Sequence, residues 1–562
     1  MNDSEDRLDS WKEIAAYLGR EVRTVQGWEK NEGLPIHRHQ HARQGSVYAF
    51  KSELDAWRKT RVESPEIVPP ASSRPWLFAA IALATVLVTV VAWGLFYWKS
   101  GQARASTSEG LSSVAVLPFL DLSPQKDQEY FSDGLSEEII DALSRVPNLR
   151  VAARTSAFAF RGKAIDIRQI GQQLNVGAVL EGSVRKSGDA LRITAQLNRV
   201  SDGYHLWSRT YDRRPADIFA LQRELSQAIA DQLRAGAVPD RATTGNVEAH
   251  RLYQEGHYFF SQHQVPESYR KAIDRYQQAI ALDPGYAAAY AGLADAYAYL
   301  AEQMAVAPRD VMPKARAAAE KAVALDDLSA DAHTSLGLVK LDYEWDIPGA
   351  QREFQRAMQL NPSSGYIRHW YAHSLEAQNR LDDAMKEMRA AQALDPLLLV
   401  LSWDITAELY WAKRNDEALR ELKKANDLFP NVPLLSYLNA LVYQQMGDKQ
   451  SARRVLDSVS STQPEAIKEP GFLALFGTQA ALEGHRDEAR RILDQLEVIS
   501  RTQYVEPVLI LDLCSALNDR ERRLMWLNRA YQARSTQFVY LPLHQQPFAG
   551  DSAAEALIAR AH

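Results

Sequence analysis

A period of 34 residues runs through the second half of the chain and constrains its fold more than any other feature. Prolines recur at this interval at Pro362, Pro396, Pro430 and Pro464. Alanines keep the same interval in two further columns, formed by Ala350, Ala384, Ala418 and Ala452 and by Ala357, Ala391 and Ala425. Small residues at fixed helical positions, with proline at the turn, predict stacked helix pairs that bury their apolar faces only against one another.

The pattern extends upstream of these columns. Tyr290, Leu293, Ala294 and Tyr297 match the first-helix pattern W-x-x-L-G-x-x-Y. Residues 246–536 therefore resemble the tetratricopeptide repeat family, with about eight units. The resemblance implies an all-α superhelix with an extended concave groove lined by first helices. A C-terminal tail, 537–562, follows.

The first helices predict a peptide-binding groove. Placing them in register with the prolines puts aromatic and histidine side chains on the inner side, and aromatic-rich grooves suit peptide segments. The alternative for each ring is that it belongs to the core between repeats. The predicted groove residues are Tyr366, His369, His373, Trp403 and Tyr410.

A second constraint is an uncharged apolar stretch at 76–98. Its 23 positions would form a helix of about 34 Å, enough to cross a hydrocarbon core of about 30 Å. Aromatic residues stand at both ends, as membrane interfaces prefer. The sequence thus predicts one transmembrane helix, flanked by flexible linkers at 62–75 and 99–112. Four cations precede the stretch and two follow it, which favours a cytoplasmic N-terminus and a bacterial inner-membrane location.

The segment 7–61 has the pattern of a helix-turn-helix. Ser10 and Glu13 have capping-box spacing, and an apolar face at i, i+3, i+4 and i+7 ends at Gly19. A second helix ends by Gly33, and a hairpin and a last helix follow. Residues 20–61 carry a net charge of +4, although the whole chain has −6. Such a local basic patch suits double-stranded DNA. The predicted DNA-binding residues are Arg23, Thr24, Gln26 and Lys30 on the second helix and Arg38 and Arg43 on the hairpin.

This segment resembles the winged helix-turn-helix of the MerR/excisionase-like group, on the stretches SWKEIAAYLGREVRTVQGWEKNEGLP and GSVYAFKSELDAW. The resemblance implies that the second helix enters the major groove while the wing contacts the backbone. Gly27 departs from the pattern, because a basic residue usually stands there. A homodimer on two half-sites would compensate for weak binding by one module. The alternative is a helical module that docks protein. His37, His39 and His41 alternate, but a polar wing surface explains them and no metal site is predicted.

Between these parts, residues 113–236 alternate strand and helix signals, with an antiparallel meander of three strands near the end. VAVLPF, FSDGLSEEI and VLEGSVRKSG resemble the TolB-like amino-terminal domain, which implies an accessory or sensory role outside the cytoplasm. P-loop, HExxH and GxSxG signatures are absent from the sequence, so no catalytic reaction and no cofactor is predicted. The one cysteine, Cys514, excludes an internal disulfide and every multi-cysteine zinc site.

The predicted fold class is therefore multidomain: a winged helix-turn-helix, one transmembrane helix, a small α/β domain and an all-α tetratricopeptide superhelix. This order predicts a membrane-integrated, one-component transcription regulator that binds DNA on one side and protein on the other. The alternative is a membrane-anchored tetratricopeptide scaffold whose N-terminal module docks protein. A third hypothesis, a non-catalytic partner of a nucleotide cyclase system, rests on domain company alone.

Overall fold

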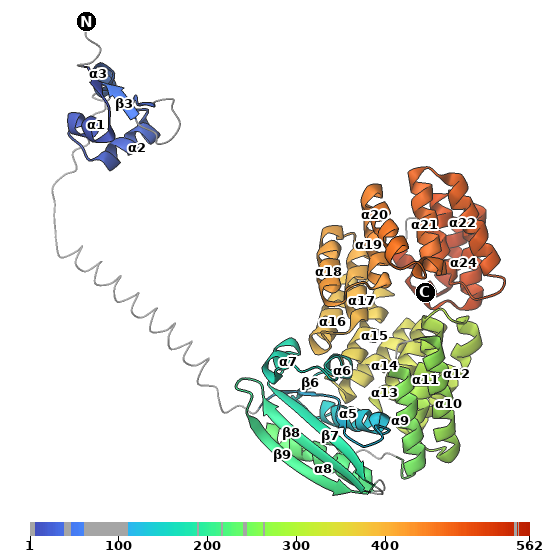
Figure 1. The fold of residues 1–562 in the computed structure, drawn as a ribbon. Helices are drawn as coiled ribbons and strands as arrows, with labels where there is room; N and C mark the ends of the chain where they lie inside the picture. The colour runs from blue at the N-terminus through green and yellow to red at the C-terminus, as the bar shows by residue number, and fades with distance from the viewer. Residues whose placement is uncertain are drawn as a thin grey trace, which may run out of the picture. The chain divides into compact units, whose positions relative to one another are not determined.

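The computed structural model describes residues 6–38, 47–60, 111–187, 190–214, 217–239, 244–261, 265–544, 548 and 550–561. These residues belong to two compact units, one ending at Thr107 and the other beginning at Ser108 (Figure 1).

The described residues of the first unit, 6–38 and 47–60, form three helices and a small antiparallel sheet of strand order β1-β3-β2. Ser10 accepts a hydrogen bond from the Glu13 backbone N–H at 3.3 Å, and Gly19 adopts a left-handed φ of 64°, so the predicted cap and stop of the first helix are confirmed. Ile14, Val25 and Leu54 form its core. The elements are β1 (Arg7–Leu8), α1 (Trp11–Leu18), α2 (Val22–Glu32), β2 (His37–Arg38), β3 (Val47–Phe50) and α3 (Lys51–Thr60).

The predicted membrane span requires a correction. Residues 76–98, together with the linker at 62–75 and positions 99–110 of the second linker, lie outside the described residues. Among the helices that the structure does describe, none is both long and apolar enough to cross a bilayer. The fold class is therefore restated without a transmembrane helix, and the prediction of a single-pass inner-membrane protein with a cytoplasmic N-terminus is withdrawn.

The second unit begins with an α/β domain whose sheet has the order β6-β4-β7-β8-β9, with β5 paired to β7. β4 runs parallel to β6 and β7, whereas β7, β8 and β9 form the predicted antiparallel meander. The strands are β4 (Ser113–Val116), β5 (Leu120–Asp121), β6 (Arg150–Val151), β7 (Ala178–Ser187), β8 (Ala190–Arg199) and β9 (His205–Arg213).

Helices cover both faces of this sheet because its strand β4 is buried and apolar on both sides. Val114 and Val116 of β4 pack in one core with α5 (Glu129–Ser144) and α8 (Ile218–Leu233). Ala115, between them in the strand, packs on the other side with Ile170 of α7 (Ile167–Gln173) and with Phe160, which follows α6 (Arg154–Phe158). Alternating side chains of one strand thus serve two separate cores.

The rest of the chain forms helix pairs that confirm the predicted tetratricopeptide repeats (Figure 1). From α14 onward, four second helices begin and end exactly one 34-residue period apart. First helices are α9 (Val247–Ser261), α11 (Ala287–Glu302), α13 (Ala330–Val339), α15 (Gly365–Glu376), α17 (Leu399–Trp411), α19 (Pro433–Met446), α21 (Pro470–Glu483) and α23 (Leu511–Ala516). Second helices are α10 (Pro266–Leu282), α12 (Pro308–Leu325), α14 (Ile347–Leu360), α16 (Leu381–Leu394), α18 (Asn415–Leu428), α20 (Lys449–Thr462), α22 (Arg486–Ile499) and α24 (Arg520–Ala533).

The α/β domain is joined to an interior point of this array by buried hydrogen bonds. The Ser156 backbone N–H, in α6, donates to Asp395 Oδ1 at 3.1 Å, and the Leu397 N–H donates to Ser156 Oγ at 2.8 Å. The Ala153 N–H donates to the Leu394 carbonyl at 3.1 Å. The turn between α16 and α17 is therefore held by the α/β domain.

The segment predicted as a tail packs back onto the middle of the array. It contains η5 (Thr536–His544) and α25 (Ser552–Ile558). Phe538 is fully buried and stacks on Trp345 with ring centroids 4.9 Å apart, while the Tyr540 hydroxyl donates to Asp342 Oδ1 at 3.3 Å. Asp342 lies in η2, a short π-helical turn over Lys340–Glu344. This contact, which we term the closure contact, joins the last repeat to the third.

Candidate functional site

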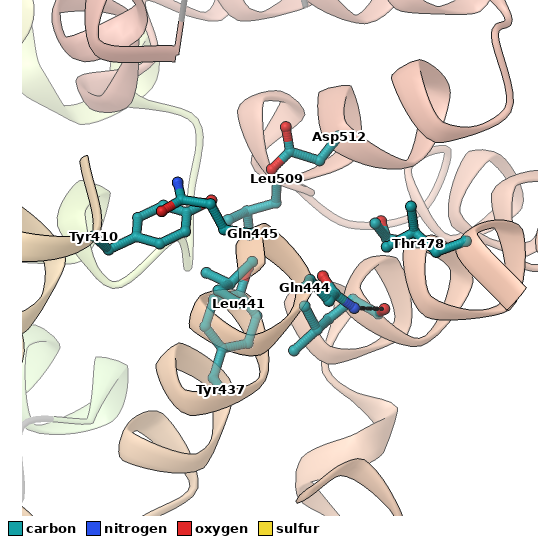
Figure 2. A pocket seen from close by; sticks show the side chains of 10 residues that line it. Tyr410, Tyr437, Leu441, Gln444, Gln445, Thr478, Leu509 and Asp512 are labelled. Atoms are coloured by element: carbon teal, nitrogen blue, oxygen red, sulfur yellow. Dashed lines mark hydrogen bonds between the residues drawn. The ribbon is translucent and has the colours of Figure 1, made fainter. Parts of the chain in front are cut away.

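A pocket opens between successive first helices of the C-terminal repeats (Figure 2). Its volume is about 140 Å³, which accommodates a group about the size of one aromatic ring. α17, α19, α21 and the start of the last pair contribute the lining. The lining residues are Tyr410, Tyr437, Leu441, Gln444, Gln445, Leu475, Thr478, Leu482, Leu509 and Asp512.

The chemistry of the pocket is mixed. Burial, and secondarily the Asp512 carboxylate, raise the pKa values of Tyr410 and Tyr437, so both phenols stay protonated at neutral pH. Gln444 donates to Gln479 Oε1 at 3.1 Å and to the Leu475 carbonyl at 3.3 Å. The pocket thus offers apolar walls, one amide fixed by hydrogen bonds and one carboxylate. This combination suits an apolar side chain that has a polar or cationic neighbour.

The five predicted groove residues do not line one common surface. Tyr410 lines the pocket. Trp403 packs with the core of its own repeats, and its buried indole Nε1 has no hydrogen-bond partner. Tyr366 packs against Trp370 with ring centroids 6.4 Å apart. The alternative of an inter-repeat core position describes Trp403 and Tyr366, and the assignment of a binding role to any of the five stays a prediction.

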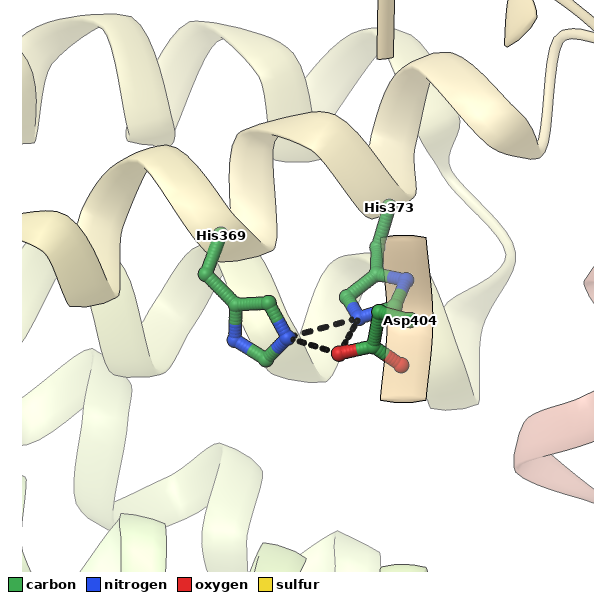
Figure 3. A group of neighbouring side chains, drawn as sticks. All are labelled: His369, His373 and Asp404. Atoms are coloured by element: carbon green, nitrogen blue, oxygen red, sulfur yellow. Dashed lines mark hydrogen bonds and ion pairs between the residues drawn. The ribbon is translucent and has the colours of Figure 1, made fainter. Parts of the chain in front are cut away.

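His369 and His373 belong to a separate buried cluster with Asp404 (Figure 3). The two histidines lie one turn apart on α15, and Asp404 reaches them from α17 of the next repeat. His369 Nε2 lies 2.7 Å from Asp404 Oδ2 and 3.1 Å from His373 Nε2. His373 Nε2 lies 3.8 Å from the same Asp404 oxygen. Three potential ligand atoms therefore converge on one point.

Further acidic side chains surround this cluster. His373 Nδ1 lies 2.6 Å from Glu376 Oε2, and Glu376 is 1% exposed. Burial lowers the pKa of the His373 imidazole, but the carboxylates of Glu376, Asp404 and Asp342 outweigh this effect and raise it to about 10. Burial and the neighbouring Glu376 carboxylate raise the pKa of Glu408 to about 11.

The predicted DNA-binding residues lie in the first unit. Arg23, Thr24, Gln26 and Lys30 are all exposed on α2, around the buried Val25. They therefore form one solvent-facing side of this helix, as the sequence predicts, but their contact with DNA stays a prediction.

Of the two predicted DNA-binding residues on the hairpin, Arg38 already forms an ion pair within the first unit. The Arg38 guanidinium donates to Glu29 Oε1 at 2.6 Å, so a contact of Arg38 with phosphate would compete with this ion pair. His37 Nε2 lies 2.7 Å from Glu53 Oε2. The two residues are 16 positions apart in the sequence, so the sequence alone did not indicate this pairing. Arg43, His39 and His41 lie outside the described residues.

Sequence reasoning missed Asp404 and Glu376 as neighbours of the histidine pair, and it missed Tyr437 and Asp512 in the pocket. One signal was available for the cluster. The spacing His369-x-x-x-His373 puts two imidazoles on one helix face, which is the spacing of helical zinc ligands.

Comparison with known proteins gives partial matches. No protein-family model matches the chain. Over 184 residues it is 41% identical to "Putative adenylate cyclase 3" of Rhizobium meliloti (strain 1021), covering 32% of this chain and 31% of that protein. Over 291 residues it is 22% identical to "Transcriptional regulator HilA" of Salmonella typhimurium, covering 50% of this chain and 51% of that protein. The chain thus spans about a third and about half of the length of these two relatives.

Among solved structures, the chain is similar to YrrB, described as a TPR protein with an unusual peptide-binding site, at a TM-score of 0.26 and 19% identity. The match covers 34% of this chain and 94% of YrrB. The prediction that this chain catalyses no reaction stays a prediction.

Proposed function

We propose that this chain is a tetratricopeptide scaffold that binds an extended segment of a partner protein on the first helices of its C-terminal repeats. The observation that carries the proposal is the pocket between α17, α19 and α21, where two phenols, the hydrogen-bonded amide of Gln444 and Asp512 lie beside apolar walls. Repeat arrays of this type present such concave surfaces to peptides.

The chemistry of the lining specifies the partner segment. An aliphatic or aromatic side chain would occupy the pocket, because Leu441, Leu475 and Leu482 supply apolar walls. A neighbouring lysine or arginine would pair with Asp512, a lining residue whose carboxylate acts electrostatically on both phenols. Affinity would come mainly from the buried side chain, and the charge would set the direction of the segment.

A charge-reversal pair tests the proposal. Peptides selected from a random library against the full chain should carry an apolar residue beside lysine or arginine. Asp512→Lys should then weaken binding of the selected peptide at least tenfold in a fluorescence polarisation titration, which corresponds to about 1.4 kcal/mol. Asp487→Lys is the matched control, because Asp487 also lies in the first turn of a helix but is 94% exposed on α22.

A steric variant gives an independent measurement. Gln445 is exposed and lines the pocket, so Gln445→Trp should fill it without removing a core side chain. Val498→Trp, at an exposed position of α22, is its control. Equal binding by all four variants would contradict a binding site in this pocket.

We also propose that the N-terminal module binds double-stranded DNA through α2. The supporting observation is that Arg23, Thr24, Gln26 and Lys30 share one exposed side of this helix. The partial match to a transcriptional regulator agrees with this hypothesis. The competing hypothesis is that the same side docks protein.

Salt dependence separates the two hypotheses. If α2 contacts phosphates, binding of duplex DNA should fall log-linearly with salt, and Arg23→Ala or Lys30→Ala should each reduce the slope by about one unit. Lys12→Ala, at an exposed position of α1, should leave the slope unchanged. Absence of DNA binding at about 50 mM salt would favour protein docking.

A further inference from the structure

We propose that His369, His373 and Asp404 form a binding site for one divalent transition-metal ion, with Zn²⁺ as the best fit. The site is distinct from the peptide pocket, and the inference does not depend on the proposed function. It rests on the convergence of three ligand atoms, on the donor set, and on the carboxylate behind His373.

The distances between the three ligand atoms fit a single ion. A zinc ion has bonds of about 2.0–2.2 Å to imidazole nitrogen and carboxylate oxygen, so neighbouring ligand atoms in a tetrahedral site lie about 3.3–3.5 Å apart. The three atoms are separated by 2.7, 3.1 and 3.8 Å. Their mean separation is therefore close to a tetrahedral edge, and shifts of a few tenths of an ångström would equalise the three distances.

The surroundings match those of metal-bound histidine. A ligating imidazole usually donates its second ring N–H to a carboxylate, which fixes the ring and raises its basicity. His373 Nδ1 has this partner in Glu376, at 2.6 Å. Glu376 in turn has the buried carboxyl of Glu408 beside it. Two nitrogens and one oxygen suit zinc better than calcium or magnesium, which prefer oxygen ligands alone.

The ion would connect two successive repeats. His369 and His373 lie on α15, and Asp404 lies on α17, so a bound ion would fix the separation of these two first helices. Three protein ligands leave a fourth position of a tetrahedral ion for water, as in sites that are not purely structural.

Zinc content of the full chain tests the proposal. The protein, purified without a histidine tag, should bind Zn²⁺ with a stoichiometry near one per chain in a background where His37, His39 and His41 are all replaced by glutamine. That background removes the alternating histidines of the sequence segment 37–41 from the count. His369→Gln and Asp404→Asn should abolish stoichiometric binding, and Glu376→Gln should weaken it 10–100-fold.

His333→Gln is the matched control. His333 also pairs with a carboxylate inside the array, Glu353 at 2.7 Å, but it does not belong to the three-residue cluster. This variant should bind zinc like the unsubstituted background. A Co²⁺-loaded sample, which needs no variant, should show the intense visible absorption of tetrahedral cobalt. No zinc uptake at micromolar metal, a cobalt spectrum of octahedral type, or uptake unchanged by His369→Gln in a folded protein would each overturn the proposal.

Discussion

Gly337 and Phe354 provide the sharpest test of how the repeats pack. Gly337 lies in α13 and Phe354 in α14, and a Cβ at position 337 would lie 2.6 Å from Phe354 Cε1. Real Cβ contacts are about 3.4 Å or longer, and Phe354 is fully buried, so the ring has no free space into which to retreat. Gly337→Ala therefore increases helix propensity but introduces a steric clash with Phe354.

The magnitudes determine the expected sign. Alanine is favoured over glycine by about 1 kcal/mol in a helix interior. Overpacking of a close-packed core costs about 1–3 kcal/mol. We expect Gly337→Ala to lower the free energy of unfolding by up to about 2 kcal/mol. Phe354→Ala should lower it by about 3–5 kcal/mol, because it leaves a cavity.

The double variant shows whether the two residues act together. With the ring removed, the clash disappears and only the helix-propensity gain remains. Gly337→Ala should thus become stabilising, by about 1 kcal/mol, in the Phe354→Ala background. Urea unfolding followed by circular dichroism measures all four proteins. If the alanine has the same effect in both backgrounds, the close approach of Gly337 to Phe354 does not determine the packing of this pair.

Three further predictions concern stability, the groove and DNA. Burial raises the pKa of Asp395 from 3.8 to about 6, against hydrogen bonds from Ser156 that lower it, so the folded chain holds a proton that the unfolded chain releases between about pH 4 and 6. The free energy of unfolding should therefore fall by up to about 3 kcal/mol as pH rises through this window. Asp395→Asn removes this titration, so the difference in unfolding free energy between the variant and the wild type, measured in urea, should change by the same amount. A difference that stays constant with pH would contradict the prediction. Trp403→Ala should cost about 3 kcal/mol of stability in thermal melts but leave peptide affinity unchanged, because Trp403 packs in the core and does not line the pocket; lost affinity at unchanged stability would reverse this assignment. Gly27→Arg, at a position where a Cβ meets nothing within 4 Å, should tighten DNA binding by about 1–3 kcal/mol and steepen the salt slope by about one unit, and unchanged titrations would place Gly27 away from the DNA.

The sequence predicted the array because each repeat needs the same small residue at the same close contact. Ala350, Ala384, Ala418 and Ala452 are all fully buried, and a larger side chain at any of them would separate two helices. The meander of the α/β domain was also predictable, because turn signals separate strands that pair with their neighbours in sequence. By contrast, the pairing of β5 with β7 joins two-residue segments and leaves no periodic pattern.

The candidate sites were less predictable because they depend on the angle between neighbouring helices. Asp404 and Trp403 are neighbours on α17, and the rotation of this helix about its axis determines which of them reaches the two histidines on α15. The repeating proline and alanine positions do not fix that rotation precisely enough to distinguish two adjacent residues. The spacing of His369 and His373 was visible, but their third partner was not. Tyr437 and Asp512 share the pocket with Tyr410 for the same reason: each comes from a different repeat.

The closure contact changes how the repeat array is expected to unfold. A stack of repeats with open ends behaves as a one-dimensional chain, in which terminal repeats fray and unfolding spreads inward. Here Phe538 and Tyr540 join the last repeat to Trp345 and Asp342 in the third, so both boundaries of the intervening stretch are held. Unfolding any repeat between them must either open an interior loop or first release the closure contact, and each route costs more than fraying a free end. Amide exchange across α15–α23 should accordingly be uniform in a chain with this segment and graded toward the C-terminus in a chain that ends at Arg534.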